Sequence, residues 1–138
     1  TASQTIKSFS TGIFPSHWLE MSKKKLYNGN VSSTWTLHRI VRDILTIFSP
    51  ICPFFTHYLS EQIYGTSSVD ICEFPRLDIE FYSDKYTKLT KPIMEFNSLV
   101  WKIKKESGIS LKNELSGISI PDELTEISDI LIQMHSLI

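Results

Sequence analysis

Glycine and cysteine are both scarce in this sequence, with five glycines and two cysteines among 138 residues. Five glycines are too few for most glycine-rich phosphate-binding loops, and neither a P-loop nor a Gly-x-Ser-x-Gly nucleophile turn occurs. Cys52 and Cys72 stand outside any Cys-x-x-Cys spacing, which favours a reducing compartment over a disulfide-built fold. We therefore expect this chain to contain no catalytic site and to bind no cofactor of its own.

A long hydrophobic run is missing as well. The most apolar stretch, from Ile44 to Tyr58, is interrupted by Pro50, Pro53 and His57, so it is too broken to cross a bilayer. The first residues lack the charged-then-apolar order of a signal peptide. We expect a soluble, cytoplasmic protein. Its histidines are scattered without metal-ligand spacing, which favours surface or hydrogen-bonded core roles; they are His17, His38, His57 and His135.

The composition is that of a globular protein, with 41% hydrophobic and 21% charged residues. Net charge is −1, but the charges alternate in blocks. Residues 1–65 carry six Lys and Arg against three Asp and Glu, residues 85–112 carry seven Lys against two Glu, and residues 113–138 carry only acids. These blocks indicate separate basic and acidic surfaces, although solvated helix faces would give the same pattern.

Apolar residues recur at helical spacing through most of the chain. The pattern predicts helices over Ile6–Tyr27, from the N-cap candidates Ser32, Ser33 and Thr34 to Phe48, over Phe54–Tyr64, over Asp84–Glu106, and onward from Asp122. Stop signals are Asn28-Gly29-Asn30, Gly65 and Gly108. We predict a mostly α fold in a single domain, residues 1–138, with bundle helices and a strap over about 1–83 and the following helices over 84–138.

Three local features modify this helical prediction. Pro15 should kink or split the first helix, whereas Pro92 either kinks the helix around it or begins its main part. The β-rich segment Val69–Phe74 is expected to form an extended strap over the bundle, anchored by Phe74 and Leu77. Ile118–Ile120 alternates like a short strand, so a small β element is also possible.

The stretch from Thr36 to Tyr64, which contains the proline-bearing helix turn Ser49-Pro50-Ile51-Cys52-Pro53-Phe54, resembles a known family. It is similar to the anticodon-binding helical domain of class I aminoacyl-tRNA synthetases of the valine, isoleucine and leucine group. The segment Ser68–Pro75 looks like the strap that follows in this family, most of all in the valine enzyme. Trp18-Leu19-Glu20, Lys25-Leu26-Tyr27 and the Lys102–Leu111 region resemble flanking segments, so the likeness covers almost the whole chain.

The chain departs from the family pattern at Gln62, Asp70 and Phe74, where an acid, His and Trp are usual. A second similarity is rejected: Met21–Lys25 looks like the lysine-rich ATP loop of these synthetases, but it continues an amphipathic helix and Glu20 replaces the leading lysine. We also expect the first helices of the domain to precede Thr1.

The resemblance implies a module that binds tRNA for a larger enzyme, which joins valine to tRNA with ATP and Mg²⁺. Its partners would be tRNA and the catalytic and editing parts of the same polypeptide, with no membrane and no DNA. Lysine and arginine would neutralise phosphates, while aromatic and amide side chains at a loop would contact bases, namely Tyr27, Asn28, Asn30 and Trp35. The RNA-binding candidates are Lys23, Lys24, Lys25, Tyr27, Asn28, Arg39, Arg42, Lys102, Lys104, Lys105 and Lys112.

Two alternatives stay open at this point. The same domain could belong to an isoleucyl-, leucyl- or methionyl-tRNA synthetase. Alternatively, the chain could be a helical protein–protein interaction module whose acidic C-terminal block docks a basic partner. Charge reversal of the candidate lysines separates the RNA-binding reading from the second alternative.

Overall fold

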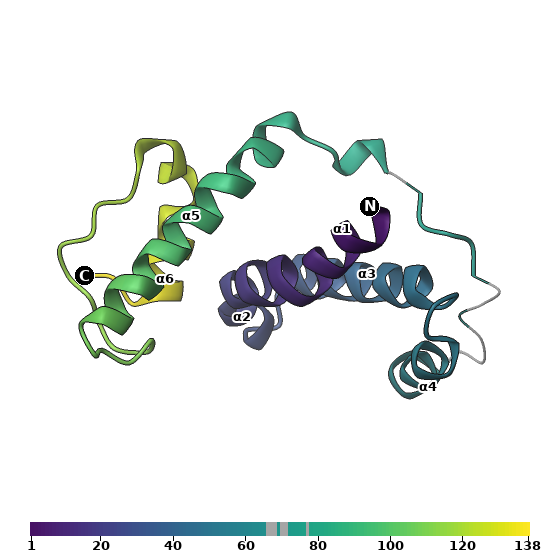
Figure 1. The fold of residues 1–138 in the computed structure, drawn as a ribbon. Coiled ribbons are helices and arrows are strands. Elements are labelled where there is room, and N and C mark those ends of the chain that lie inside the picture. The colour runs from purple at the N-terminus through teal and green to yellow at the C-terminus, as the bar shows by residue number, and fades with distance from the viewer. Residues whose placement is uncertain (66–68, 70–71, 77) are drawn as a thin grey trace. The chain divides into compact units, whose positions relative to one another are not determined.

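A computed structural model describes residues 1–65, 69, 72–76 and 78–138. Figure 1 labels its helices α1 to α6, and the π and 3₁₀ segments between them are called η1 to η3 in the text. The chain forms two compact units: residues Thr1–Lys23 together with Phe81–Ile138 make unit 1, and residues Lys24–Glu80 make unit 2. The single domain predicted over residues 1–138, subdivided at about residue 83, stays a prediction. The N-terminal segment belongs with the C-terminal half because it packs against helix α5.

The N-terminal segment is helical, as predicted, and begins earlier than expected. Helix α1 spans Ala2–Ser8, the π-helical segment η1 spans Phe9–Leu19, and helix α2 spans Glu20–Tyr27. Pro15 lies inside η1. In α geometry its ring would clash with the carbonyl four residues earlier, and the wider π turn relieves that contact. The proline thus changes the helix type rather than splitting the helix.

Helix α3, Val31–Phe48, belongs to unit 2 and follows the predicted stop at Asn28-Gly29-Asn30, where Gly29 adopts φ +70°. The N-cap is Asn30, whose side chain accepts a hydrogen bond from the Ser33 N–H at 2.9 Å. The predicted caps, Ser32 to Thr34, are wrong because Asn30 already satisfies this N–H and the three lie inside the helix. The apolar residues Leu37, Val41, Ile44 and Phe48 of this helix are half-buried, and Leu45 is its most buried apolar side chain.

Helix α4, Pro53–Tyr64, begins with proline at its first position and ends at Gly65 in the left-handed conformation, as predicted. Its polar side chains Thr56 and Ser60 are buried. The aromatic residues at its start are exposed, since Phe54 is 91% and Phe55 is 63% accessible. The predicted helix is therefore confirmed, and the side chains that it buries are polar rather than aromatic.

The predicted strap is described in part. Val69 is buried, and residues 72–76 have no regular secondary structure. Phe74 was expected to anchor the strap, but its side chain is exposed, so that expectation is wrong. The strap residues Ser68, Asp70 and Ile71 and the second anchor, Leu77, lie outside the described residues.

Unit 1 is built on helix α5, Asp84–Glu106, whose predicted bounds are confirmed. Pro92 lies inside this helix rather than at its start. The 3₁₀ segment η3, Asp122–Ile127, leads into helix α6, Ser128–His135, which packs beside α5 (Figure 1). The core contains Phe96, Val100, Leu124, Leu131 and Leu137.

The predicted strand at Ile118–Ile120 does not form, since residues 118–121 have no regular structure. The β element is instead an isolated bridge between Leu115 and Leu137. A short 3₁₀ segment, η2 at Ile79–Phe81, precedes α5. The fold class is therefore mostly α, as predicted. Within the described part of the chain, we find no helix with the length and apolar character needed to span a membrane.

Candidate nucleic-acid interface

The first candidate cluster, Lys23 to Lys25, lies on α2. Lys23 pairs with Glu20 one turn earlier, so part of its charge is already compensated. Lys24 and Lys25 are exposed in the last turn of the helix, where cations interact favourably with the helix dipole. The segment Met21–Lys25 is helical throughout, which confirms that it continues a helix and does not form a loop.

The turn after α2 carries the next candidates. Tyr27 is 85% exposed, and the Asn28 side chain is exposed beside it. Both are accessible to a partner. Asn30, by contrast, uses its side-chain oxygen to cap α3, which removes that acceptor from the set of groups that would read a base edge.

Arg39 and Arg42 lie on one face of α3 but differ in their electrostatic surroundings. Arg39 Nε lies 3.2 Å from Oδ2 of Asp43, and its Nη1 lies 3.9 Å from Oδ2 of Asp78. Two carboxylates thus compensate its charge. Arg42 stacks on the ring of Tyr64, with Cζ 4.5 Å from the ring centroid. Within residues 1–65, 69, 72–76 and 78–138, no carboxylate lies within ion-pair distance of Arg42.

Tyr64 is held in place by His38. The tyrosine hydroxyl donates to the backbone carbonyl of His38 at 3.3 Å, and His38 Nδ1 lies 3.2 Å from the same hydroxyl. Burial raises the pKa of Tyr64, while the neighbouring Arg42 charge acts in the opposite direction. The tyrosine therefore keeps its proton and offers Arg42 a fixed aromatic face.

Two hollows in unit 2 share these arginines. The first, of about 710 Å³, lies along the start of α3 and is lined by Gly29, Val31, Thr34, Trp35, His38, Arg39 and Arg42. The second, of about 520 Å³, lies between α3, the end of α4 and the described part of the strap. Arg39 and Arg42 line both hollows.

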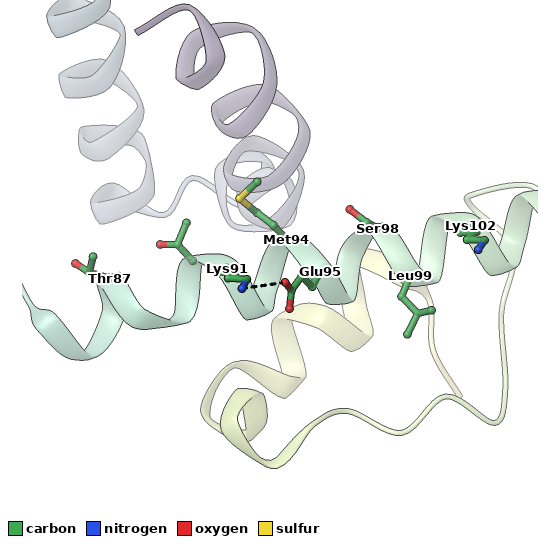
Figure 2. A pocket seen from close by; sticks show the side chains of 8 residues that line it. Thr87, Lys91, Met94, Glu95, Ser98, Leu99 and Lys102 are labelled. Atoms are coloured by element: carbon green, nitrogen blue, oxygen red, sulfur yellow. Dashed lines mark ion pairs between the residues drawn. The ribbon is translucent and has the colours of Figure 1, made fainter. Parts of the chain in front are cut away.

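Unit 1 carries a separate row of lysines along α5. Lys91 and Glu95 lie 3.7 Å apart, and Lys102 and Glu106 lie 3.9 Å apart; Figure 2 shows the first pair and the position of Lys102. A hollow of about 690 Å³ runs between Thr87 and Lys102 on this face. Exposed pairs of this kind contribute about 0–1 kcal/mol, so a phosphate can compete with the carboxylates for the lysines. Lys105 and Lys112 are exposed as well.

Lys104 does not belong in the RNA-binding set. Its side chain is 0% exposed, and its ammonium donates to three backbone carbonyls: Leu111 at 2.9 Å, Asn113 at 2.5 Å and His135 at 2.7 Å. Burial lowers its pKa. A phosphate cannot reach this ammonium without unfolding the segment around it. The sequence held the signal, because Lys104 follows Phe96 and Val100 at four-residue spacing on the buried stripe.

A hydrogen-bonded row of three polar side chains, His17, Asn97 and His135, was not predicted from the sequence. The His135 Nε2–H donates to Oδ1 of Asn97 at 2.7 Å, and Nδ2 of Asn97 donates to Nδ1 of His17 at 3.1 Å. The Trp101 ring lies between the two imidazoles, with centroids at 5.3 Å from His17 and 5.8 Å from His135. A histidine on an apolar helix face is the only sequence signal, and it does not identify the partner.

Both histidines of this hydrogen-bonded group, His17 and His135, are neutral at physiological pH. Burial, reinforced by the charge of Lys104 and by His17, lowers the pKa of His135 to about 4. Burial also lowers the pKa of His17. The group thus fixes the core of unit 1 rather than carrying out chemistry. Across the described residues, no three His, Cys, Asp or Glu side chains are grouped closely enough to hold a metal ion.

Comparison with known proteins adds an independent finding. The family model described as the anticodon-binding domain of tRNA ligase matches residues 1–119. The valine–tRNA ligase of Nanoarchaeum equitans is 29% identical over 129 residues, which is 91% of this chain and 16% of that protein. The valine–tRNA ligase of Aeropyrum pernix is 32% identical over 119 residues, which is 78% of this chain and 14% of that protein.

A third relative, the valine–tRNA ligase of Saccharolobus solfataricus, is 28% identical over 114 residues, with 82% of this chain and 14% of that protein covered. No solved structure matches the chain significantly. The chain spans about 16% of the length of the Nanoarchaeum relative. Because the family model matches residues 1–119, which is most of the sequence, this chain belongs to the anticodon-binding domain family of tRNA ligases.

Proposed function

We propose that this chain is the anticodon-binding part of a valine–tRNA ligase and binds tRNA(Val) for ATP-dependent aminoacylation. The family match over residues 1–119, combined with relatives that are named valine–tRNA ligases, carries the proposal. The same names favour valine over isoleucine, leucine or methionine. ATP and Mg²⁺ would act in other parts of the ligase polypeptide.

The accessible cations support RNA binding in each unit. Among the predicted RNA-binding residues, exposed cations include Lys102, Lys105 and Lys112 in unit 1 and Lys24, Lys25 and Arg42 in unit 2. Each phosphate neutralised by a lysine or arginine releases condensed counterions, so affinity should fall steeply as salt rises. Tyr27 and Asn28 would add contacts to bases or sugars, which phosphate neutralisation alone does not provide.

A charge-reversal experiment tests the proposal. The double variant Lys102→Glu/Lys105→Glu should bind a tRNA(Val) transcript at least tenfold more weakly, with a smaller dependence of log Kd on log salt. The matched control is Lys7→Glu/Lys88→Glu, which changes net charge equally at exposed lysines outside the predicted set. Equal weakening by both double variants, or none by either, would show that these lysines form no RNA interface.

The exposed aromatic face of α4 supports a second part of the proposal, the contact with the rest of the ligase. Phe54, Phe55 and Tyr58 of α4 and Ile51 in the turn before it are all exposed. An apolar patch of this kind marks a protein contact. In the full-length ligase, Phe54→Ser/Phe55→Ser should lower the melting temperature. The same change in this chain alone should have little effect, and equal effects in both would contradict the contact.

A further inference from the structure

The hollow at the start of α3 combines an aromatic ring with a held cation. Val31, Trp35, His38 and Arg42 follow one another at spacings of four, three and four residues, so they share one face of the helix. All four line the hollow of about 710 Å³. The Trp35 side chain is 50% exposed. This face thus offers an accessible indole and an accessible guanidinium in one concave site.

Of the two arginines on this face, Arg42 is the one whose charge no carboxylate compensates among the described residues. Arg39 is engaged by Asp43 and Asp78, whereas Arg42 rests on the Tyr64 ring. Stacking on an aromatic face restricts the guanidinium to a few orientations while its N–H groups remain able to donate. The hydrogen bonds between Tyr64 and His38 fix that aromatic face in turn. Arg42 is therefore preorganised for a bidentate acceptor such as a phosphate.

Trp35 lies seven residues before Arg42, which corresponds to about 10 Å along the helix axis. This separation lets one ligand contact both side chains only if it has a flat apolar part and an anionic part joined by a spacer. An unpaired nucleotide within an RNA strand has that composition, because its base stacks on aromatic rings and its backbone carries phosphates. Paired bases in a duplex are already stacked and present no face to Trp35.

We propose that this hollow binds an unpaired nucleotide of the RNA, with its base stacked on Trp35 and a neighbouring phosphate held by Arg42. The proposal rests on the RNA-binding function proposed above and assigns it a specific contact. It also ranks the two α3 arginines, since Arg42 contributes more to RNA affinity than Arg39. A base contact at Trp35 and a phosphate contact at Arg42 differ in their response to salt, which allows each to be measured separately.

The experiment measures binding of a fluorescently labelled single-stranded RNA with the sequence of the tRNA(Val) anticodon loop to the 138-residue chain across a range of salt concentrations. Trp35→Ala should weaken binding about 5- to 100-fold and leave the salt slope unchanged, because stacking releases no counterions. Trp35→Phe should retain binding within about fivefold, since phenylalanine also stacks. Circular dichroism checks that each variant keeps its helices.

Arg42→Ala should weaken binding and lower the salt slope by about one, as expected for the loss of one phosphate contact. Arg42→Lys keeps the charge but loses the planar stack on Tyr64, so it should restore the slope while recovering only part of the affinity. The matched control is Arg39→Ala, on the same helix face with its charge already compensated, which should change affinity less than Arg42→Ala.

The outcomes separate this inference from the proposed function. If the wild-type chain binds no RNA, both are wrong. If it binds RNA with unchanged affinity in Trp35→Ala and Arg42→Ala, the nucleotide site is wrong and the broader function stands. If duplex RNA competes for the chain as effectively as the single strand does, the nucleotide site is also wrong.

Discussion

The Lys104 ammonium lies 2.7 Å from the backbone carbonyl oxygen of His135, the last residue of α6. The same ammonium also bonds the carbonyls of Leu111 and Asn113, so one side chain ties the end of α6 to the loop that follows α5. A positive charge at a helix C-terminus is favoured by the helix dipole. These three hydrogen bonds offset the free-energy cost of burying the ammonium, which has no carboxylate partner among the described residues.

Replacing Lys104 with methionine should destabilise unit 1 by about 3 kcal/mol, because buried carbonyls lose a charged donor. Urea unfolding followed by circular dichroism measures the change. Lys105→Met is the matched control, and as an exposed neighbour it should change the free energy of unfolding by less than about 0.5 kcal/mol. Equal effects of the two substitutions would contradict the structural role of Lys104.

Stability should fall as pH drops from about 6.5 to 4. Buried His135 has a folded pKa of about 4 against 6.5 in the unfolded chain, so the unfolded state binds more protons in this window. The contribution to the free energy of unfolding is about 3 kcal/mol above the window and is lost as pH falls through it. Urea unfolding at a series of pH values measures this loss.

His135→Gln keeps a side-chain N–H donor for Asn97 but removes the titrating group, so the pH dependence should flatten in this variant. Gln133→Ala, at an exposed position of the same helix that carries no titrating group, is the control and should keep the wild-type pH profile. A variant lacking His135 that still loses stability as steeply as the wild type between pH 6.5 and 4 would refute the assignment.

Cutting back the aromatic side chains of α4 should cost the isolated chain little. Phe54 is almost fully exposed, so Phe54→Ser should change the free energy of unfolding of unit 2 by less than about 0.5 kcal/mol. Leu45 is buried in α3, and Leu45→Ala should cost about 2–4 kcal/mol. A larger loss from the phenylalanine than from the leucine would mean that α4 buries the opposite face.

The cap of α3 gives a smaller, sharply local effect. Asn30→Ala removes the acceptor for the Ser33 N–H and should lower the free energy of unfolding by about 1 kcal/mol. Ser32→Ala, at an exposed position inside the helix, is the control and should be close to neutral. Thermal melts of both variants read out the difference; a greater loss from Ser32→Ala would place the cap there.

Helix positions follow from the sequence because they depend on local signals. The bounds of α5 and the stop at Gly65 were predicted from apolar spacing and a glycine that can adopt positive φ. Burial follows less well because it depends on what packs against each face. The periodicity of α4 is clear, yet it cannot tell whether Phe54 or Thr56 faces inward, and in this chain Thr56 does.

The candidate site shows the same limit. Charge and composition placed the buried Lys104 in the same predicted set as exposed lysines, because a one-dimensional list of cations does not separate surface from core. Only the three-dimensional contacts show that Arg39 is compensated by Asp78, which lies 39 positions later in the sequence, and that Arg42 is held by Tyr64. The difference between the two arginines could not be predicted from their neighbours in sequence.

The most direct test of the account compares the affinity of this chain for two parts of one tRNA. The isolated anticodon stem-loop of tRNA(Val) is titrated against the acceptor-stem minihelix of the same tRNA, at equal salt. We predict at least tenfold tighter binding to the anticodon stem-loop. Equal affinity for the two RNAs, or tighter binding to the minihelix, would contradict the assignment of this chain as an anticodon-binding domain.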